Sequence, residues 1–426
     1  MNPPQRVGGV AFQSESAQAE CSIPTAVLNL SETCGFFNIL KRTRVLANRR
    51  MGGRKLATTD EKWMRLALKL AEKGFTPPNP MVGCVLVRNG VLVGQGLCPM
   101  AGQPHAEVFA LRYAGLLATG STAYVTLEPH NYHGKTPPCT DALIRAGVAR
   151  VVVATLDTNP RINGQGMAQL REAGIETLVG VLEHEARRLN EAFFHFHEHG
   201  TPFTTLKAAM TLDGKIATRS GHSQWVTSQK ARDFSHLLRA RSGAVMVGVN
   251  TLLADDPALT ARLSPASPRQ PLRIIVDSRL RTPSESQAVS LSNLQTPLLI
   301  ATSQNSNSEN ETLLKRSGVE VLRLPETSQG RVSLPALMKE LASRGVISVL
   351  VDGGGELHAS LLKEGLANKI LFFIAPKIAG GATSPTAVGG EGVSLMTDAY
   401  QVQRLTTKRL GPDILLEGYL PNKDMR

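Results

Sequence analysis

The sequence predicts a chain of two successive α/β units, and three observations indicate this class. Its 426 residues exceed what one hydrophobic core usually organises. From about residue 59 onward, short apolar strand patterns alternate with helical patterns. Further on, the apolar run 346–351 leads directly into the Gly-rich turn 352–356, and a helical pattern follows. Such alternation is typical of sheets with helices packed on their faces.

Residues 1–57 differ from the remainder. They hold eight Lys/Arg against three Asp/Glu and so carry +5 of the net charge of +12. They have no clear periodicity, which indicates a disordered extension or a misassigned start, with Met51 close to the first folded pattern. A targeting peptide is the alternative, and Glu15, Glu20 and Glu32 count against it, as does the lack of a continuous apolar segment.

The first unit is predicted over residues 58–199. Thr59 is expected to cap a helix whose apolar residues recur at helical spacing until Gly74, and Gly90 marks a hairpin turn. The elements expected in chain order are a helix from 59, strands at 82–87 and 91–93, a helix opening at His105, a strand at 123–127, a helix from Cys139 and a strand at 151–154. This order predicts a three-layer α/β sandwich.

The second unit is predicted over residues 200–426, after a helix ending near Gly200. Residues 264–271, 282–297 and 303–311 are interpreted as surface connections. Buried strands are expected at 204–208, 244–249, 273–276, 346–351, 370–375 and 414–416, which predicts a mostly parallel sheet.

Four side chains of the first unit form a pattern typical of zinc-dependent deaminases. Such a site needs three protein ligands, one open position, and a carboxylate that moves protons without binding the metal. His105, His130 and Cys139 can supply the ligands, and Glu107 the carboxylate. The segment 105–107 alone is better explained as the start of a surface helix, but its combination with the later Glu-Pro-His and Pro-Pro-Cys segments favours the metal site.

The Gly-rich turn 352–356 of the second unit joins a buried strand to a helix. Backbone N–H groups at such a turn can bind the phosphates of a dinucleotide. The turn lacks the Gly-x-Gly-x-x-Gly spacing, so a tight crossover turn explains it as well.

Several separate motifs lie between about residues 60 and 420. They are Asn79-Pro80-Met81-Val82-Gly83, Pro104-His105-Ala106-Glu107-Val108, Leu127-Glu128-Pro129, His133-Gly134-Lys135-Thr136-Pro137-Pro138-Cys139, Leu206-Lys207-Ala208-Ala209, Asp213-Gly214-Lys215, Ser223-Gln224-Trp225-Val226-Thr227-Ser228 and the run 250–260. Together they resemble the bifunctional deaminase/reductase family of riboflavin biosynthesis. The resemblance implies a cytidine-deaminase-like three-layer sandwich followed by a dihydrofolate-reductase-like α/β domain. It also implies one Zn²⁺, NADPH and a phosphorylated pyrimidine substrate.

The resemblance also implies residue roles. Lys207 and Asp255 become catalytic candidates beside Glu107. The implied cofactor contacts are Ala209, Trp225, Thr251, Asp255, Ser278, Gly354, Gly355, Glu356, Leu357, His358, Ala359 and Ser360. The implied substrate contacts are Asn79, Lys135, Ser223, Arg239, Leu259, Arg262 and Asp352. From the residues alone, Arg239 and Arg262 suit a sugar phosphate, although an arginine is more often simply solvated.

Two positions depart from the family pattern. His130 stands where the family has a ligand Cys, and Asp352 where it usually has Glu. One thiolate fewer raises the charge of a zinc site from 0 to +1, and an imidazole places its donor atom further from the backbone. The site therefore binds zinc with altered properties, or it has lost zinc and the chain acts as a reductase only. Asp352 keeps the negative charge but has one methylene less reach.

Composition limits the remaining possibilities. Five cysteines without close pairing predict a reducing compartment, the cytoplasm, rather than a disulfide framework. No apolar run approaches the roughly 18 residues that span a bilayer, so no membrane association is expected. A nucleic-acid-binding deaminase-like module is a third interpretation, but aromatic residues are only 4% and the second unit would be unexplained. We expect no nucleic-acid partner and a homo-oligomer, dimer or tetramer.

Overall fold

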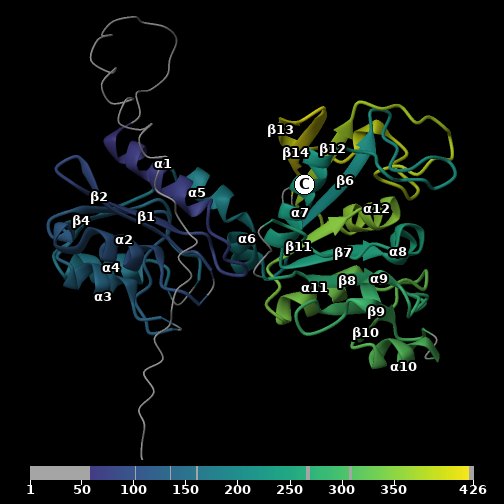
Figure 1. The fold of residues 1–426 in the computed structure, drawn as a ribbon, viewed down its shortest axis with the longest axis horizontal. Coiled ribbons are helices and arrows are strands. Elements are labelled where there is room, and N and C mark those ends of the chain that lie inside the picture. The colour runs from purple at the N-terminus through teal and green to yellow at the C-terminus, as the bar shows by residue number, and fades with distance from the viewer. Residues whose placement is uncertain are drawn as a thin grey trace, which may run out of the picture. The chain divides into compact units, whose positions relative to one another are not determined.

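The computed structural model describes residues 58–100, 102–134, 136–159, 162–264, 269–306 and 309–421. The predictions for residues 1–57 lie outside the described residues. Within the described ranges the strands form one five-stranded and one nine-stranded sheet (Figure 1). Helices pack on both, so the predicted α/β class is confirmed.

The first sheet has the strand order β2-β1-β3-β4-β5. β1 pairs antiparallel with β2 and with β3, whereas β3, β4 and β5 run parallel. The strands are β1 (Gly83–Arg88), β2 (Val91–Leu97), β3 (Thr122–Val125), β4 (Arg150–Val153) and β5 (Glu176–Val179).

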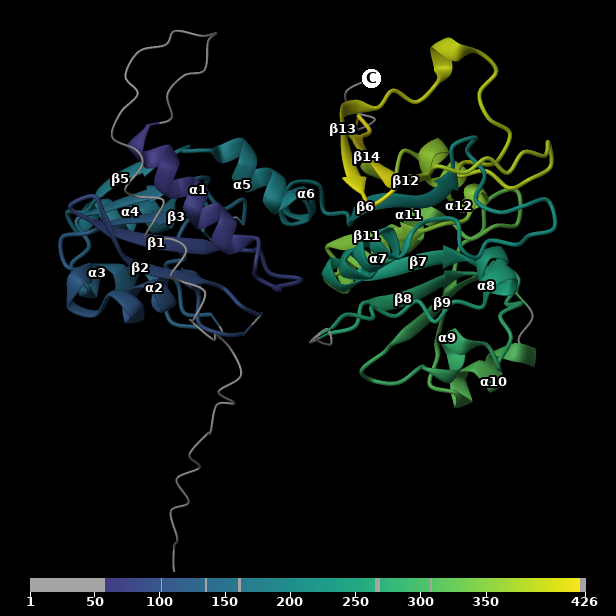
Figure 2. The ribbon, with the colours of Figure 1, turned by 45° about the horizontal axis from the view of Figure 1, so that its top comes forward.

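Helices cover both faces of this sheet and make the predicted three layers (Figure 2). α1 (Thr59–Ala71) and α5 (Glu183–Leu189) pack on one face, and α1 is capped by the hydroxyl of Thr58, one residue earlier than predicted. The other face is covered by α2 (Ala106–Ala114), α3 (Cys139–Arg145) and α4 (Gln165–Glu172), and the short helix η2 (Gly115–Ala118) follows α2.

The second sheet has the order β10-β9-β8-β7-β11-β6-β12-β14-β13. All pairings from β10 to β12 are parallel, and β14 and β13 add antiparallel pairings at one edge. The strands are β6 (Phe203–Thr211), β7 (Ala244–Gly248), β8 (Leu272–Val276), β9 (Leu298–Ser303), β10 (Glu320–Leu324), β11 (Ser348–Asp352), β12 (Lys369–Ala375), β13 (Gln403–Leu410) and β14 (Asp413–Tyr419).

Helix α6 (Glu191–His199) precedes this sheet in the chain. One face of the sheet packs against α11 (Leu334–Ser343) and α12 (Gly355–Glu364). The other face packs against α7 (Gln229–Arg241), α8 (Val249–Asp255), α9 (Gln287–Ser290) and α10 (Glu309–Arg316). The carboxyl ends of parallel strands are where open α/β sheets usually bind ligands.

Two segments predicted as surface connections contain helices. α9 lies inside 282–297 and buries Ala288 and Val289, and α10 begins inside 303–311. A helix of one turn is too short to produce a detectable period in the sequence, which explains the missed α9.

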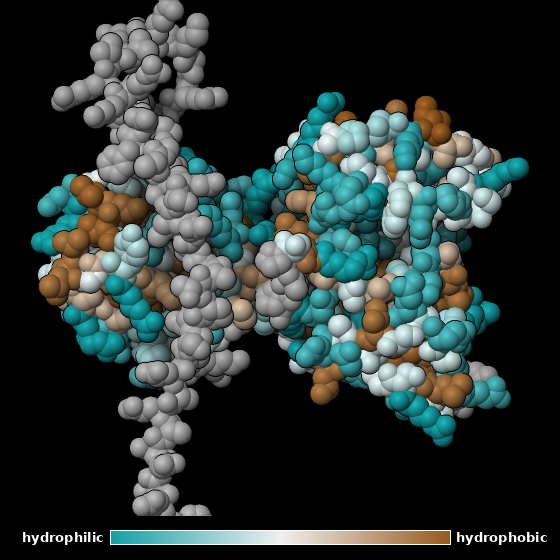
Figure 3. Space-filling model, in the orientation of Figure 1, coloured by the Kyte–Doolittle hydropathy of each residue, from teal (hydrophilic) through white to brown (hydrophobic). Residues whose placement is uncertain are grey.

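The helices of the described residues are all too short or too polar to cross a membrane. On the face drawn in Figure 3, hydrophobic side chains lie in separate groups among hydrophilic ones.

Candidate functional sites

Two glycines of β2 allow α2 to lie directly against the first sheet. A Cβ atom on Gly96 would lie 2.2 Å from the carbonyl oxygen of Ala106, and one on Gly94 only 2.4 Å from another carbonyl of the same helix. Only glycine fits such an approach. The contact fixes the N-terminus of α2, where His105 is the N-cap residue and Glu107 lies in the first turn.

The backbone ties His130 to Cys139. The His130 carbonyl oxygen accepts hydrogen bonds from the N–H groups of Cys139 at 3.0 Å and Thr140 at 3.3 Å, at the start of α3. The Thr140 hydroxyl donates to the same oxygen at 3.4 Å. These bonds set the spacing of the two side chains on the loop and the helix.

Glu128, two residues before His130, anchors the loop from the other side. Its buried carboxylate accepts four backbone hydrogen bonds, which satisfies the charge without a counter-ion. The donors are the N–H groups of Asp157 (3.2 Å), Gly164 (2.9 Å), Gly166 (3.0 Å) and Met167 (3.2 Å). The glutamate of the Glu-Pro-His segment therefore holds the loop in place.

The potential ligand atoms of His105, His130 and Cys139 lie within 4.8 Å of one another. His105 Nδ1 is 3.4 Å from Cys139 Sγ. A tetrahedral zinc ion with bonds of about 2.0 Å to nitrogen and about 2.3 Å to sulfur separates such atoms by roughly 3.3–3.6 Å. The three donors fit zinc after a movement of about one ångström, which side-chain rotation can supply.

Burial sets the protonation of these groups. It lowers the pKa of His105 to about 4, with a further contribution from His130, and it also lowers the pKa of His130. Both imidazoles are therefore neutral near pH 7, which is the form that binds metals. Burial raises the pKa of the Cys139 thiol well above its usual range, and Glu107 raises it further. A metal ion is then the group that would stabilise the thiolate.

Glu107 lies next to these ligands in an almost fully buried position. Only 3% of its surface is exposed, and its Oε2 atom has no hydrogen-bond partner within the described ranges. Burial raises the pKa of its carboxyl group. A carboxyl group with a raised pKa binds a proton more readily than an exposed one, which suits it to accept and release a proton.

The two predicted substrate residues of the first unit have different outcomes. Asn79 is exposed in a turn, where its N–H donates to the Thr76 carbonyl oxygen at 2.7 Å. Lys135 lies outside the described residues.

Thr136 was not predicted individually, although its hydroxyl lies 3.3 Å from His105 Nε2 and so helps to orient that ring. It belongs to the quoted Lys-Thr-Pro-Pro-Cys segment, which was the available signal.

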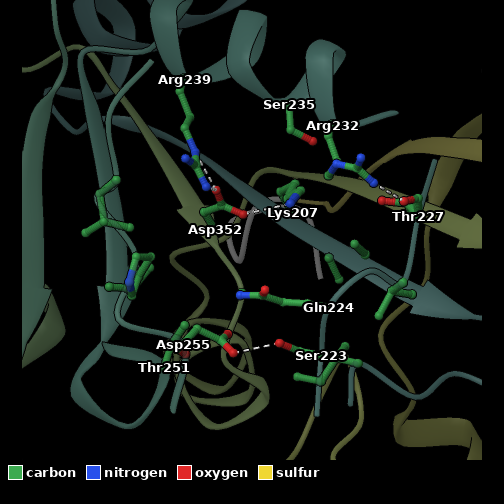
Figure 4. A pocket seen from close by; sticks show the side chains of 18 of the residues that line it. Lys207, Ser223, Gln224, Thr227, Arg232, Ser235, Arg239, Thr251, Asp255 and Asp352 are labelled. Carbon is green, nitrogen blue, oxygen red and sulfur yellow. Dashed lines mark hydrogen bonds and ion pairs between the residues drawn. The ribbon is translucent and has the colours of Figure 1, made fainter. Parts of the chain in front are cut away.

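The second sheet carries an open cavity of about 780 Å³ (Figure 4). The cavity is lined from the carboxyl-terminal part of β6, from α7 and α8, and from the end of β11 with the glycines that follow it. The predicted residues in its wall are Lys207, Ala209, Ser223, Trp225, Arg239, Thr251, Asp255, Leu259, Arg262, Asp352, Gly354 and His358.

A buried carboxylate holds two cations on one side of the cavity. Asp352 Oδ1 accepts from Lys207 Nζ at 2.8 Å, and Oδ2 accepts from Arg239 Nε at 2.7 Å (Figure 4). The exposed fractions of the three side chains are only 6% for Asp352, 12% for Lys207 and 15% for Arg239. Burial by itself raises the pKa of Asp352, but Arg239 and Lys207 outweigh it and hold that pKa well below its usual range. Although aspartate is one methylene shorter than glutamate, the Asp352 carboxylate reaches both Lys207 and Arg239.

A second polar pair lies across the cavity. Ser223 Oγ donates to Asp255 Oδ1 at 2.7 Å, and Figure 4 shows Gln224 between this pair and the Asp352 cluster. The Arg232 guanidinium lies over the Trp225 ring, 4.5 Å from its centroid, in cation–π geometry. The cavity therefore offers an aromatic surface and two separate sets of charged groups.

The turn after β11 requires glycine. Gly353 and Gly354 have φ values of 93° and 94°, and a Cβ atom on Gly354 would lie 2.9 Å from Thr251 Oγ1. The backbone can therefore pass close to α8 at the cavity wall.

The remaining predicted cofactor residues, Ser278, Gly355, Glu356, Leu357, Ala359 and Ser360, are not among the described lining residues. Glu356 instead accepts a hydrogen bond from the Gly390 N–H at 2.9 Å.

Four polar lining residues were not predicted as a group. Arg232, Ser235, His236 and Arg239 all line the cavity from α7. Their spacing of i, i+3, i+4 and i+7 places them on one face of a helix, and this periodicity was the signal in the sequence. Burial, with Arg239 and Arg262 next, lowers the pKa of His236 to about 4, so the positive charge there comes from the arginines.

Comparison with known proteins places both sites in a family. Residues 57–155 match the cytidine and deoxycytidylate deaminase zinc-binding region, and residues 202–416 match the RibD C-terminal domain. The riboflavin biosynthesis protein RibD of Aquifex aeolicus is 45% identical over 84% of this chain and 97% of its own length. The chain belongs to the RibD family.

Other RibD proteins support the assignment over similar lengths. The Escherichia coli protein is 42% identical over 84% of this chain and 98% of its own. The solved RibD structure from Acinetobacter baumannii is 36% identical with a TM-score of 0.74, covering 85% of this chain and 99% of that one. A solved deaminase/reductase from Thermotoga maritima is 33% identical with a TM-score of 0.72 over the same shares. This RibD family member is therefore a bifunctional enzyme of riboflavin biosynthesis with a deaminase and a reductase domain.

Proposed function

We propose that the chain catalyses two consecutive steps on one phosphorylated pyrimidine. The first is hydrolytic deamination of 2,5-diamino-6-ribosylamino-pyrimidinone 5'-phosphate, in which water replaces a ring amine and ammonia leaves. The second is reduction of the ribosylamino group to ribitylamino by NADPH and a proton. We assign residues 58–199 to the first step and 200–426 to the second, a division supported by the separate sheets.

For the deamination, His105, His130 and Cys139 would hold the zinc ion. Zinc supplies Lewis acidity that makes a water molecule a nucleophile near neutral pH. Glu107 would take the proton of that water and deliver it to the leaving amine. Its unpartnered Oε2 and its buried position beside the ligands are the observations that support this role. Asn79 and Lys135 remain proposed substrate contacts.

For the reduction, NADPH supplies the hydride, and the chain binds and orients both molecules. Ala209, Trp225, Thr251, Ser278 and the 354–360 segment are the proposed cofactor contacts. Lys207 is held at 2.8 Å from Asp352 and so points a cation into the cavity, where it can polarise the opening sugar or supply its proton. Asp255, bonded to Ser223, is the second candidate for moving that proton.

The substrate phosphate would meet Arg262 and the neighbouring Arg239. Burial, and next the charge of Arg239, lower the pKa of Arg262, so an anion between the two guanidinium groups would relieve their repulsion. Leu259, almost fully buried in the wall with φ of 56°, would shape the same side of the cavity.

The formation of a homo-oligomer remains a prediction.

A split assay on one preparation tests the proposal. Ammonia release is measured on the diamino substrate, and NADPH oxidation on the deaminated one. Both are expected. Glu107→Gln should abolish ammonia release and leave NADPH oxidation unchanged, and Lys207→Met should do the reverse. NADPH oxidation without ammonia release from the zinc-loaded protein would contradict the deaminase half and favour a reductase-only chain.

A further inference from the structure

The His130 ring lies where a metal ligand would lie. It keeps only 8% of its surface exposed and lies near the rings of His105, at a centroid distance of 4.5 Å, and Tyr132, at 5.7 Å. Its Nε2 atom is buried and has no hydrogen-bond partner in the part of the chain that the structure describes. A buried ring nitrogen left unpaired costs free energy unless something binds it.

The backbone of Thr136 and Pro137 lies close enough to the His130 ring to influence its protonation. Histidine ligands usually donate their second N–H to a carbonyl oxygen or a carboxylate, which fixes the tautomer and the ring orientation. The His130 ring thus keeps one buried, unpartnered nitrogen, and its potential ligand atom lies within 4.8 Å of those of His105 and Cys139.

No second thiol takes the place of the missing one. Cys84 and Cys98 are free and buried, and both are close enough to Glu107 for its charge to raise the pKa of their thiols. Among the described residues, however, the only group of at least three ligand side chains close enough for one ion is His105, His130 and Cys139. The donor set is two imidazoles and one thiolate.

We propose that this donor set shifts the cation preference of the site away from soft ions such as Cd²⁺ and toward borderline ions such as Zn²⁺ and Co²⁺. Thiolates favour soft cations, whereas imidazoles suit zinc and the borderline divalent ions, so exchanging one thiolate for imidazole changes the ratio of affinities. The inference rests on the metal site of the proposed function but not on catalysis. His130 is then the residue that determines metal specificity.

Cobalt spectroscopy on the full chain tests the donor set. The metal is removed with a chelator, Co²⁺ is added, and the thiolate-to-cobalt charge-transfer absorption is measured per bound cobalt. We expect a band of one-thiolate intensity in the native protein and about twice that intensity in His130→Cys, since the band scales with the number of thiolates. Cys139→Ser should remove the band entirely. His133→Ala, which alters an exposed histidine of the same loop, is the matched control and should change nothing.

Competition between Cd²⁺ and Zn²⁺ tests the preference. The ratio of cadmium to zinc affinity is expected to rise several-fold in His130→Cys relative to the native chain. Equal cadmium-to-zinc ratios or equal cobalt bands in the native chain and His130→Cys would overturn the inference. So would a band that survives Cys139→Ser, unchanged metal binding in His130→Ala, or a native protein that binds no metal. A one-thiolate band without ammonia release would instead contradict only the deaminase proposal, and ammonia release with a two-thiolate band only the inference.

Discussion

Removal of the Asp352 charge is the most direct test of the second site. In Asp352→Asn, Lys207 and Arg239 lose the carboxylate that now lies 2.8 Å and 2.7 Å from their nitrogen atoms. All three side chains are at most 15% exposed, so water cannot replace the lost partner fully. Breaking a buried ion pair from one side costs about 3–5 kcal/mol. We expect a fall of this size in the unfolding free energy at pH 7.

The pH dependence of this effect has a defined sign. Because Arg239 and Lys207 outweigh burial and lower the pKa of Asp352 in the folded state, its stabilisation is complete above the unfolded-state value of 3.8 and is lost as the pH falls through the folded-state pKa. The stability difference between the native chain and Asp352→Asn should therefore be constant near neutral pH and should shrink in acid. Urea titrations from pH 7 down to pH 3 measure it.

The same substitution should impair reduction. A charge-assisted hydrogen bond contributes about 1.5–3 kcal/mol, so the loss of Lys207 orientation predicts a kcat/KM for NADPH oxidation lower by roughly 10- to 150-fold. Ammonia release should be unchanged. Asp352→Glu, which keeps the charge and adds one methylene, is the matched control and should retain most of the activity. An Asp352→Asn variant with native stability and native NADPH oxidation would refute the reasoning.

Three further predictions concern packing and ion pairs. Gly96→Ala should destabilise the deaminase domain by about 1–3 kcal/mol and reduce ammonia release but not NADPH oxidation, because the new methyl group would overlap the α2 backbone. Asp60→Asn should lower stability by about 1–2 kcal/mol at pH 7, because it removes the bidentate pairing with Arg150 at 2.9 Å and 3.1 Å. Arg273→Met should cost about 2–4 kcal/mol, because the fully buried guanidinium donates to three backbone carbonyl groups.

Unfolding followed by circular dichroism measures all three effects. Gly248→Ala controls for the added methyl group, since the nearest atom to its Cβ would lie 3.9 Å away. The hydrogen bond from Arg150 is the main cause that lowers the pKa of Asp60, so the deficit of Asp60→Asn should vanish as the pH falls below the ordinary carboxyl range. Native stability in Arg273→Met would show that the carbonyl groups bonded to Arg273 find other donors. Full ammonia release in Gly96→Ala would show that α2 can move without cost.

Much of this protein could be predicted from the order of its residues. The alternation of strand and helix patterns predicted both α/β units, because each period reflects which side chains of one element face the core. His105 and Glu107, two residues apart at a predicted helix start, were expected in one pocket because both lie at the N-terminus of α2. A turn between strand and helix was predicted at the glycines after β11, and Gly353 and Gly354 adopt positive φ there. These features are local, so neighbouring residues specify them.

The contacts that complete the sites depend on the tertiary structure. Lys207 and Asp352 are 145 residues apart and meet because β6 and β11 pair in parallel with these two residues in register. Ser223, in a loop, and Asp255, at the end of α8, form a hydrogen bond across 32 residues of sequence, and no local pattern links them. The sequence placed an imidazole at position 130, but only the fold buries its Nε2 without a partner and brings the ring within reach of His105 and Cys139. Strand register and loop anchoring act between distant segments, and no period within one segment records them.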